Sequence, residues 1–280
     1  MAENSTFQRS CEHWSEAGRA EMDHFYALAA VDYKHIANAI NWGRWLEEQQ
    51  ERVGRRQLKL LDIACGSGKF PRALRELKEV KKADLLPIQY SLLDPSKFSL
   101  SEARANLGPP FHGAKQFETT LQALNCGAGE FDIAWATHAL YAVPRAELEK
   151  ALYQLINATS GVAFIAHASE ASHYLRFYQY YIDGFKDRIG EPFSSAENIA
   201  ETLTRMGISY REKTISYDNL ASEEANDLVQ GYLQRCVFDD SIDLRQMCKN
   251  PITGNYLEKC VNKGSWCFKQ DVTLFFIQVH

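Results

Sequence analysis

Residues 58–70, LKLLDIACGSGKF, form an apolar run that ends in an acid and a turn containing two glycines. The run has the length of a buried strand, and the residues after Gly68 have the pattern of a helix. At a strand–turn–helix junction the free amide hydrogens of the first helical turn point outward. Gly66 and Gly68 also lack the Cβ that would keep a ligand away from the backbone. This stretch therefore predicts an α/β fold with a ligand-binding turn.

Short apolar runs alternate with helix-like segments from residue 58 to residue 168, which indicates βαβ units and a parallel sheet. Runs such as FDIAWAT at 131–137 are apolar throughout, as expected of strands that helices cover on both faces. Earlier in the chain the pattern predicts helices at 69–80, 99–107 and 144–157. Beyond residue 168 it predicts helices at 173–185, 195–206, 222–237 and 242–260, and strands at 208–217 and 271–279.

The chain has 280 residues, of which 45% are hydrophobic and 24% charged, so it can bury a sizeable core. No repeat or Pro/Gly/Ser linker divides it, which favours one elaborated domain over two. Apolar residues recur with helical spacing at 20–50, before the first strand. We expect an N-terminal helical lid segment at 1–57 and a main domain at 58–280, with helices after residue 168 forming a substrate pocket. Trp42 and Trp45 fit a lid, a core-packing element or a dimer element equally well.

The net charge of −5 gives no basic surface for nucleic acid. No window approaches the roughly 18 consecutive apolar residues of a membrane-spanning helix, and the first twenty residues lack the apolar run of a secretory signal. Seven scattered cysteines without a CxxC pair indicate neither a disulfide framework nor a metal site. We therefore expect a cytoplasmic protein without a metal, nucleic-acid or membrane partner. We also expect a monomer or homodimer that acts on a small molecule.

Two acids follow neighbouring strands. Asp62 ends the first strand, and Asp94 ends the second in YSLLDPS. The turn does not match GxGxxG, and a carboxylate would repel a pyrophosphate, so an NAD-dependent oxidoreductase is disfavoured. An acid one strand beyond the glycine turn suits the two ribose hydroxyls of an adenosine. By itself Asp94 could also be a turn cap before Pro95. Together the two acids favour a ligand with an adenosine and a cationic group.

The segments LLDIACGSGKF, LLDPS and FDIAWATHALYAVP resemble, in order and spacing, the motifs of class I S-adenosylmethionine-dependent methyltransferases. This resemblance implies a Rossmann-like fold: a mostly parallel seven-stranded sheet with an antiparallel last strand and helices on both faces. It also implies S-adenosyl-L-methionine as the cofactor. That family usually has glycine where Ala64 stands. The cofactor-binding residues implied are Asp62, Ala64, Gly66, Gly68, Asp94, Thr119, Thr120, Leu121 and Thr137.

A closer resemblance rests on HALYAVPRAELEKALYQLI, YLQRCVF and GSWCFKQDVTLFFIQVH. These segments look like the histamine N-methyltransferase group of small-amine enzymes. In that group an acid of the N-terminal helix and two amides contact the substrate. The matching positions are Asp32 or Tyr33, then His138 where the first amide is expected, and Gln270 or Asp271.

Methyl transfer from a sulfonium is an in-line displacement, and a neutral histidine suits an acceptor that must lose a proton. His138 follows the fourth strand, and His167 ends the fifth at the same edge of the sheet; either could instead be structural. Tyr141 follows directly and could stack on an amine or heteroaromatic acceptor. His138 and Tyr141 are the catalytic candidates, and Asp32, Tyr33, His167 and Gln270 complete the acceptor site. A nitrogen acceptor is favoured; an O- or C-methyltransferase of a specialised metabolite, or a non-catalytic S-adenosylmethionine-binding module, remain as alternatives.

Overall fold

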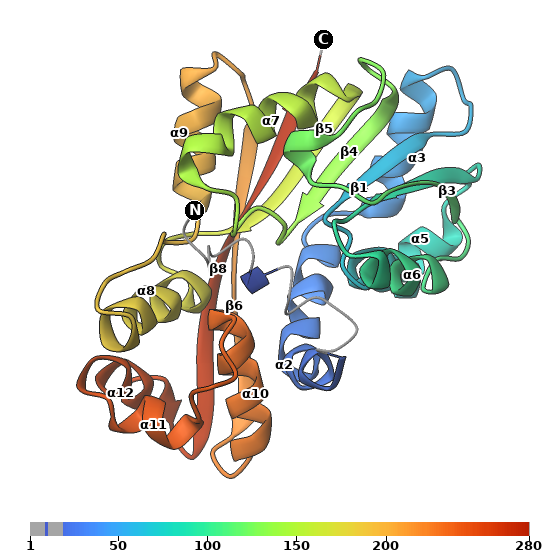
Figure 1. Ribbon diagram of the computed structural model, residues 1–280. Coiled ribbons are helices and arrows are strands. Elements are labelled where there is room, and N and C mark those ends of the chain that lie inside the picture. The colour runs from blue at the N-terminus through green and yellow to red at the C-terminus, as the bar shows by residue number, and fades with distance from the viewer. Residues whose placement is uncertain (1–8, 11–18, 280) are drawn as a thin grey trace.

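The computed structural model describes residues 9–10 and 19–279. One mixed β-sheet forms the centre of the fold (Figure 1). The strand order is β3-β2-β1-β4-β5-β8-β6, and the two-residue β7 (Val261–Asn262) pairs with β8. Neighbours among β1 to β5 are parallel, whereas β8 is antiparallel to both β5 and β6. The expected mostly parallel sheet with an antiparallel last strand is confirmed. The strands are β1 (Lys59–Ile63), β2 (Ile88–Leu93), β3 (Phe111–Phe117), β4 (Phe131–Thr137), β5 (Thr159–Ala168), β6 (Arg211–Ser222) and β8 (Ser265–Gln278).

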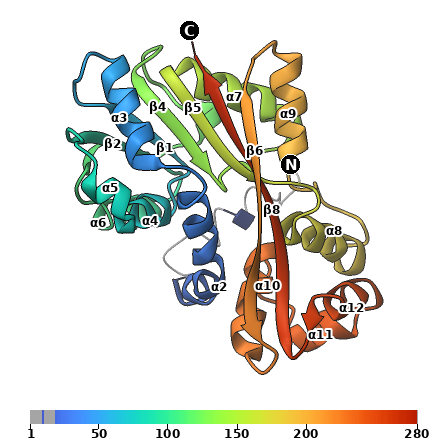
Figure 2. The ribbon, with the colours of Figure 1, turned by 180° about the vertical axis from the view of Figure 1, so that it is seen from behind.

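Helices cover both faces of the sheet (Figures 1 and 2). Side chains alternate along β1, so Leu60 packs with α3 to α6 and Leu61 packs with α7 and α9. The helices are α2 (Arg19–Ala37), α3 (Trp42–Arg52), α4 (Lys69–Glu76), α5 (Lys78–Lys82), α6 (Lys97–Ala105), α7 (Leu148–Asn157), α8 (His173–Phe185), α9 (Ala196–Arg205), α10 (Asn226–Val237), α11 (Leu244–Lys249) and α12 (Pro251–Glu258), with 3-10 turns η2 (Leu121–Ala123) and η3 (Arg145–Glu147).

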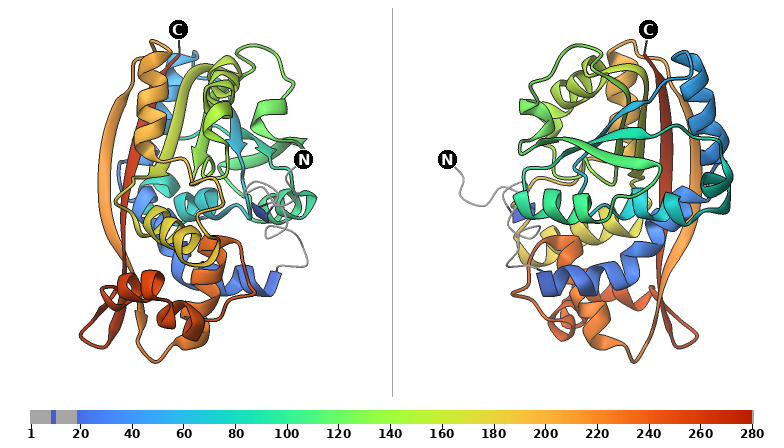
Figure 3. Two further views of the ribbon diagram at one scale, coloured as in Figure 1. Left: turned by 60° about the vertical axis from the view of Figure 1, so that its left-hand side comes forward. Right: turned by 90° about the vertical axis from the view of Figure 1, so that its right-hand side faces the viewer.

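A third core lies beyond the carboxyl edge of the parallel strands. There β6 and β8 continue as a two-stranded ribbon along the length of the molecule (Figure 3). Helices α2, α8, α10, α11 and α12 surround the far end of this ribbon (Figure 1). Both strands are longer than expected, since β8 begins at Ser265 rather than at residue 271. Residues 265–270 alternate in burial, which is the period of a strand with one buried face.

Two expected helices are broken into pairs. The helix expected at 242–260 is divided at Asn250 and Pro251, since a residue before proline is driven out of the helical region. The Asn250 side chain accepts hydrogen bonds from the amides of Ile252 and Thr253, at 2.9 and 3.2 Å, and so starts α12. The helix expected at 69–80 is interrupted at Leu77, whose backbone is extended.

The N-terminal segment has two different environments. In α3, Trp42 is fully buried and its indole N–H donates to the carbonyl of Ile36 at 3.1 Å. Its ring contacts those of Phe70, Trp135 and Phe164 on one face of the sheet. Trp42 therefore belongs to the core, and α2 is the part of the segment that borders a cleft.

Gly68 and Gly207 test how the glycine turn is packed. Both have φ near +71°, but a Cβ at Gly68 would lie 3.0 Å from Ala103 Cα of α6, whereas one at Gly207 would meet nothing within 4 Å. Gly207→Ala should lower the free energy of unfolding by about 1–2 kcal/mol, the cost of the left-handed backbone. Gly68→Ala should lower it by a further 1–3 kcal/mol, roughly the cost of overpacking. Urea unfolding measures both, and equal losses would contradict close packing of the turn on α6.

Candidate functional site

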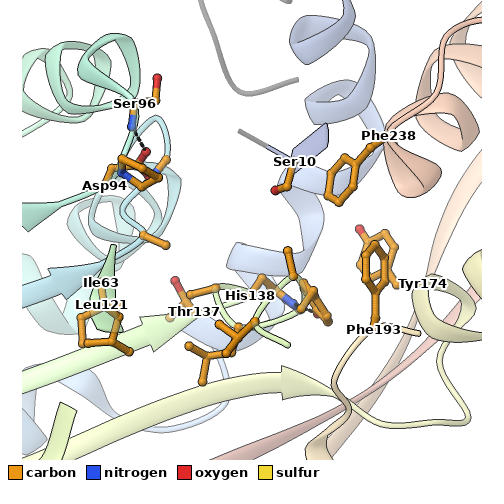
Figure 4. Close-up of a pocket in the computed structure, with 18 of the residues that line it drawn as sticks. Ser10, Ile63, Asp94, Ser96, Leu121, Thr137, His138, Tyr174, Phe193 and Phe238 are labelled. Atoms are coloured by element: carbon orange, nitrogen blue, oxygen red, sulfur yellow. Dashed lines mark hydrogen bonds between the residues drawn. The ribbon is translucent and has the colours of Figure 1, made fainter. Parts of the chain in front are cut away.

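A cleft opens at the carboxyl ends of β1, β2 and β4, where the sheet meets α2, α8 and α10. It holds about 1310 Å³ of empty space, counted out to its open mouth. Figure 4 shows Asp94 and Ser96 at one end of the cleft, Tyr174, Phe193 and Phe238 at the other, and His138 between them.

The turn after β1 lines one end of the cleft. Ala64, Gly66 and Gly68 have φ of 48°, 50° and 71°, all in the left-handed region. Ala64 takes this conformation despite its Cβ, which costs about 1–2 kcal/mol. Ala64 and Gly66 border the cleft, while Gly68 packs on α6. A Cβ at Gly66 would come within 3.5 Å of Tyr26 Oη, so the missing Cβ keeps this end of the cleft open.

Asp94 connects the two turns at this end. Its Oδ2 accepts a hydrogen bond from the amide of Gly66 at 3.1 Å, and its Oδ1 accepts one from the amide of Ser96 at 2.8 Å. Burial raises the pKa of Asp94 to about 6, and the two backbone hydrogen bonds act in the opposite direction. Asp94 is therefore a turn cap and also a carboxylate that lines the cleft.

Asp62 has a different surrounding from the one the sequence suggested. It does not border the cleft, and its Oδ2 accepts a hydrogen bond from Tyr90 Oη at 2.7 Å. Trp135 donates to the same hydroxyl at 3.1 Å. Burial raises the pKa of Asp62 to about 7. The contacts of this carboxyl group are thus with neighbouring strands, directly beneath the turn.

Other cofactor candidates lie at the same end. Thr120 and Leu121, at the start of η2, border the cleft together with Thr137 at the end of β4. Thr119 does not border it, whereas Gln122 does. Gln122 was missed, although it follows Leu121 directly.

His138 and Tyr141 form a pair at the middle of the cleft. His138 has φ of 54°, and its Nδ1 lies 2.5 Å from Tyr141 Oη. Its Nε2 is buried and has no hydrogen-bond partner among the described residues. Burial, with a smaller contribution from His167, lowers the pKa of His138 to about 3. The imidazole is therefore neutral at pH 7, and Nε2 is left to donate to or accept from a ligand.

The other end of the cleft combines a carboxylate with aromatic rings. Asp32 of α2 is 2% exposed, and its Oδ2 accepts a hydrogen bond from Tyr174 Oη at 2.5 Å. The Tyr33 ring stands edge-on to His138, with centroids 5.8 Å apart. Both Asp32 and Tyr33 border the cleft, as does Tyr174.

Two acceptor candidates do not border the cleft. His167 is fully buried, and its Nε2 lies 2.9 Å from the carbonyl oxygen of Ser194. Its ring supports Tyr141 from behind, with centroids 4.1 Å apart. Gln270 is also buried and donates from Nε2 to Tyr232 Oη at 3.2 Å. These two residues support the cleft wall in this structure.

Several cleft residues were not identified from the sequence. They come from segments far apart in the chain, so no local pattern connects them. Arg235 could have been found, because it lies in the YLQRCVF segment. The missed residues include Ser10, Phe25, Tyr26, Phe193, Arg235, Cys236 and Phe238.

Comparisons with protein-family models and with curated proteins give no match. Solved structures do match. The magnesium protoporphyrin IX methyltransferase of Synechocystis PCC 6803, with bound SAH, has a TM-score of 0.55 at 10% identity, over 97% of this chain and 99% of that one. The plantazolicin methyltransferase BpumL in complex with SAH has a TM-score of 0.50 at 10% identity, over 98% and 95%.

The chain has the class I methyltransferase fold. In this fold the expected sheet, with helices on both faces, is confirmed. The comparisons support no finer group, so the likeness to the histamine N-methyltransferases remains a prediction. Within the described ranges, no helix is long and apolar enough to span a membrane, and no group of three or more His, Cys, Asp or Glu side chains could hold a metal.

The buried Asp62 predicts a pH effect on stability. Its pKa is about 7 in the folded protein and about 3.9 in an unfolded chain, so the folded state binds more protons between these values. The contribution of Asp62 to stability must then fall as the pH rises through this window. The stability of Asp62→Asn relative to the wild type should therefore rise between pH 5 and pH 8.

Urea unfolding at both pH values measures this difference. Asp218→Asn is the control, since Asp218 is exposed and its replacement should change stability little at either pH. A stability difference for Asp62→Asn that does not rise between pH 5 and pH 8 would show that Asp62 is ionised in the folded protein without cost.

Proposed function

We propose that this chain transfers a methyl group from S-adenosylmethionine to a nitrogen of a small molecule. The observation that carries the proposal is one continuous cleft with two unlike ends. One end has a left-handed glycine turn and the Asp94 carboxylate, and the other has the Asp32 carboxylate among aromatic rings. His138 lies between the ends, where a methyl donor and an acceptor would meet (Figure 4).

The residues at the first end fit an adenosine-containing ligand. Gly66 leaves space that a Cβ would fill, and the Asp94 carboxylate has lone pairs beyond the two that its backbone donors use. We infer that Asp94 accepts hydrogen bonds from the ribose hydroxyls and that Thr120 and Leu121 bracket the adenine. S-adenosylmethionine would supply a methyl group on a positively charged sulfur. SAH or SAM is bound in the structures of two similar methyltransferases.

The acceptor end supports a nitrogen substrate. A carboxylate attracts a cation, and aromatic faces attract one as well. Asp32 and Tyr33, the positions that the likeness to the histamine N-methyltransferase group implies, both border the cleft, while Gln270 does not. The chain's own part in the reaction is to hold the acceptor, align it and exclude water.

The cofactor can be tested by binding. S-adenosylhomocysteine should raise the melting temperature, because a ligand at 100 times its Kd adds about 2.7 kcal/mol to the free energy of unfolding. NAD should not raise it. Asp94→Asn should weaken S-adenosylhomocysteine binding in calorimetry by about 1–3 kcal/mol, the usual cost of losing a hydrogen bond to a charged group. Asp218→Asn, on the exposed side of β6, is the matched control. Equal melting shifts with NAD would refute the cofactor assignment.

His138 can be tested by turnover. A panel of primary amines, phenols and carbon acids first identifies which acceptor is methylated. Because His138 is neutral and held by Tyr141, its hydrogen bond should orient the acceptor and contribute about 1 kcal/mol, a several-fold effect. His138→Ala should lower turnover by that factor and leave S-adenosylhomocysteine affinity intact. Wild-type turnover in the variant would remove His138 from the acceptor site, and a loss of 10²-fold or more would instead make it a general base.

A further inference from the structure

Three polar side chains from two elements, α8 and β6, lie close to Asp32. Tyr174 Oη of α8 donates to its Oδ2 at 2.5 Å. Tyr217 and Asn219 of β6 lie near enough to lower its pKa, yet neither forms a hydrogen bond with it in this structure. Asp32 Oδ1, Tyr217 Oη and Asn219 Nδ2 are buried and have no hydrogen-bond partner among the described residues. Unpaired buried polar atoms are rare because they cost free energy. These three atoms would be satisfied by a bound ligand or by a proton on Asp32.

The strand register explains how Tyr217 and Asn219 meet Asp32. They are two residues apart on β6, so both side chains point to the same face of the ribbon. That face packs on α2, the helix that carries Asp32. Tyr217 and Asn219 are 7% and 0% exposed, so both are buried where β6 packs on α2. β6 therefore brings two buried polar side chains to the helix that borders the acceptor end of the cleft.

The groups that face Asp32 are neutral at pH 7. They are Tyr33 on its own helix, Tyr174 of α8, Tyr217 of β6, Tyr232 and Cys236 of α10, and Tyr141 after β4. Burial raises the pKa of each of these hydroxyls and of the thiol. Within the described part of the chain, no lysine, arginine or histidine forms an ion pair with Asp32. The charge of the carboxylate is therefore not balanced by a cationic side chain of the described residues.

Other bases near the acceptor are weaker candidates. His138 has a pKa of about 3, and its Nδ1 is occupied by Tyr141. Asp94 lies at the opposite end of the cleft, with both oxygens bound to backbone amides. Asp32 is the carboxylate that borders the acceptor end and keeps one oxygen, Oδ1, without a hydrogen bond.

We propose that Asp32 is the general base of the reaction and that Tyr174, Tyr217 and Asn219 are its positioning residues. This inference rests on the proposed transfer to a nitrogen. An ammonium acceptor gives one proton to Asp32 Oδ1, which leaves a neutral amine with a free lone pair. That lone pair forms the new nitrogen–carbon bond as the carbon–sulfur bond breaks, and the bonding electrons stay on sulfur. The products are a methylated ammonium, the thioether and a protonated Asp32, which loses its proton to water.

The environment gives Asp32 a suitable basicity. Burial raises its pKa to about 7, while the hydrogen bond from Tyr174 and the nearby polar groups of Asn219 and Tyr217 lower it. General bases work best when their pKa is near the working pH. The ionised form must act, so kcat/KM should rise with pH through this value. Loss of a donor should move the rise to higher pH.

The first experiment replaces Asp32 by asparagine, which keeps its shape but cannot take a proton. With the amine that turns over fastest in the panel, Asp32→Asn should lower kcat by about 10²- to 10⁴-fold and abolish the rise of kcat/KM near pH 7. The melting shift with S-adenosylhomocysteine should be unchanged, which shows that the variant is folded. A raised KM with an unchanged kcat and pH profile would mean that Asp32 only anchors the substrate, and would overturn the proposal.

The second experiment tests the positioning residues. Tyr217→Phe and Tyr174→Phe each remove one hydroxyl and should move the rise of kcat/KM to higher pH. Tyr178→Phe is the matched control, since Tyr178 lies one turn further along α8 and its hydroxyl accepts a hydrogen bond from Arg9 at 2.8 Å. Its pH profile should not move. Equal profiles for all three variants and the wild type would exclude the positioning role.

The two proposals can fail separately. If S-adenosylhomocysteine does not bind, the proposed function fails first. If it binds but no amine turns over, calorimetry with benzylamine on the S-adenosylhomocysteine complex tests the contact between Asp32 and an ammonium group, which proton transfer to Asp32 requires. Binding should then strengthen with pH around 7 in the wild type and be lost in Asp32→Asn. The absence of benzylamine binding, or equal binding to both proteins, would overturn the role of Asp32.

Discussion

The carboxylate of Asp94 binds two backbone amides that belong to different turns. Gly66 follows β1 and Ser96 follows β2, and the two strands are parallel neighbours, so their carboxyl ends lie side by side. One carboxylate thus fixes both turns and keeps the left-handed backbone of the first. Because β1 also pairs with β4, residue Ala136 lies beside Ile63, which brings His138 to the same edge. The geometry of the cleft therefore depends on the hydrogen bonds of Asp94 to the turns after β1 and β2.

The sequence predicted the parts of the molecule in which function and local pattern coincide. The strand at 131–137 was predicted with its observed bounds, and the turn at Gly66 and the acid at Asp94 both border the cleft. It could not predict which face of a strand each polar residue takes. Asp62 and Gln270 are buried in strands, and their contacts depend on Tyr90 and Tyr232, which come from elsewhere in the fold. Four aromatic residues that line the cleft were missed for the same reason, because they come from α2, the end of α10 and the loop before α9. They are Phe25, Tyr26, Phe193 and Phe238.

The ribbon of β6 and β8 links the parallel part of the sheet to the outer helices. Near the sheet it pairs with β5, and further on it carries the third core with α8 and α10. A few residues with alternating burial, at 265–270, therefore determine whether the outer helices have a surface on which to pack. Residues of the outer core can change while the turn after β1 keeps its packing, since the two belong to different hydrophobic clusters.

The strand order also bears on how the protein is made. In the sheet, β8 lies between β5 and β6, although it follows both in the sequence. While the chain is being synthesised, β6 leaves the ribosome without a neighbour to pair with, and it must wait until α10, α11, α12 and β8 have been made. During that interval its edge is open to any other extended chain, and exposed edges of this kind promote aggregation. The first half of β6 is rich in polar and charged residues, which oppose aggregation of an unpaired strand. They include Arg211, Glu212 and Lys213.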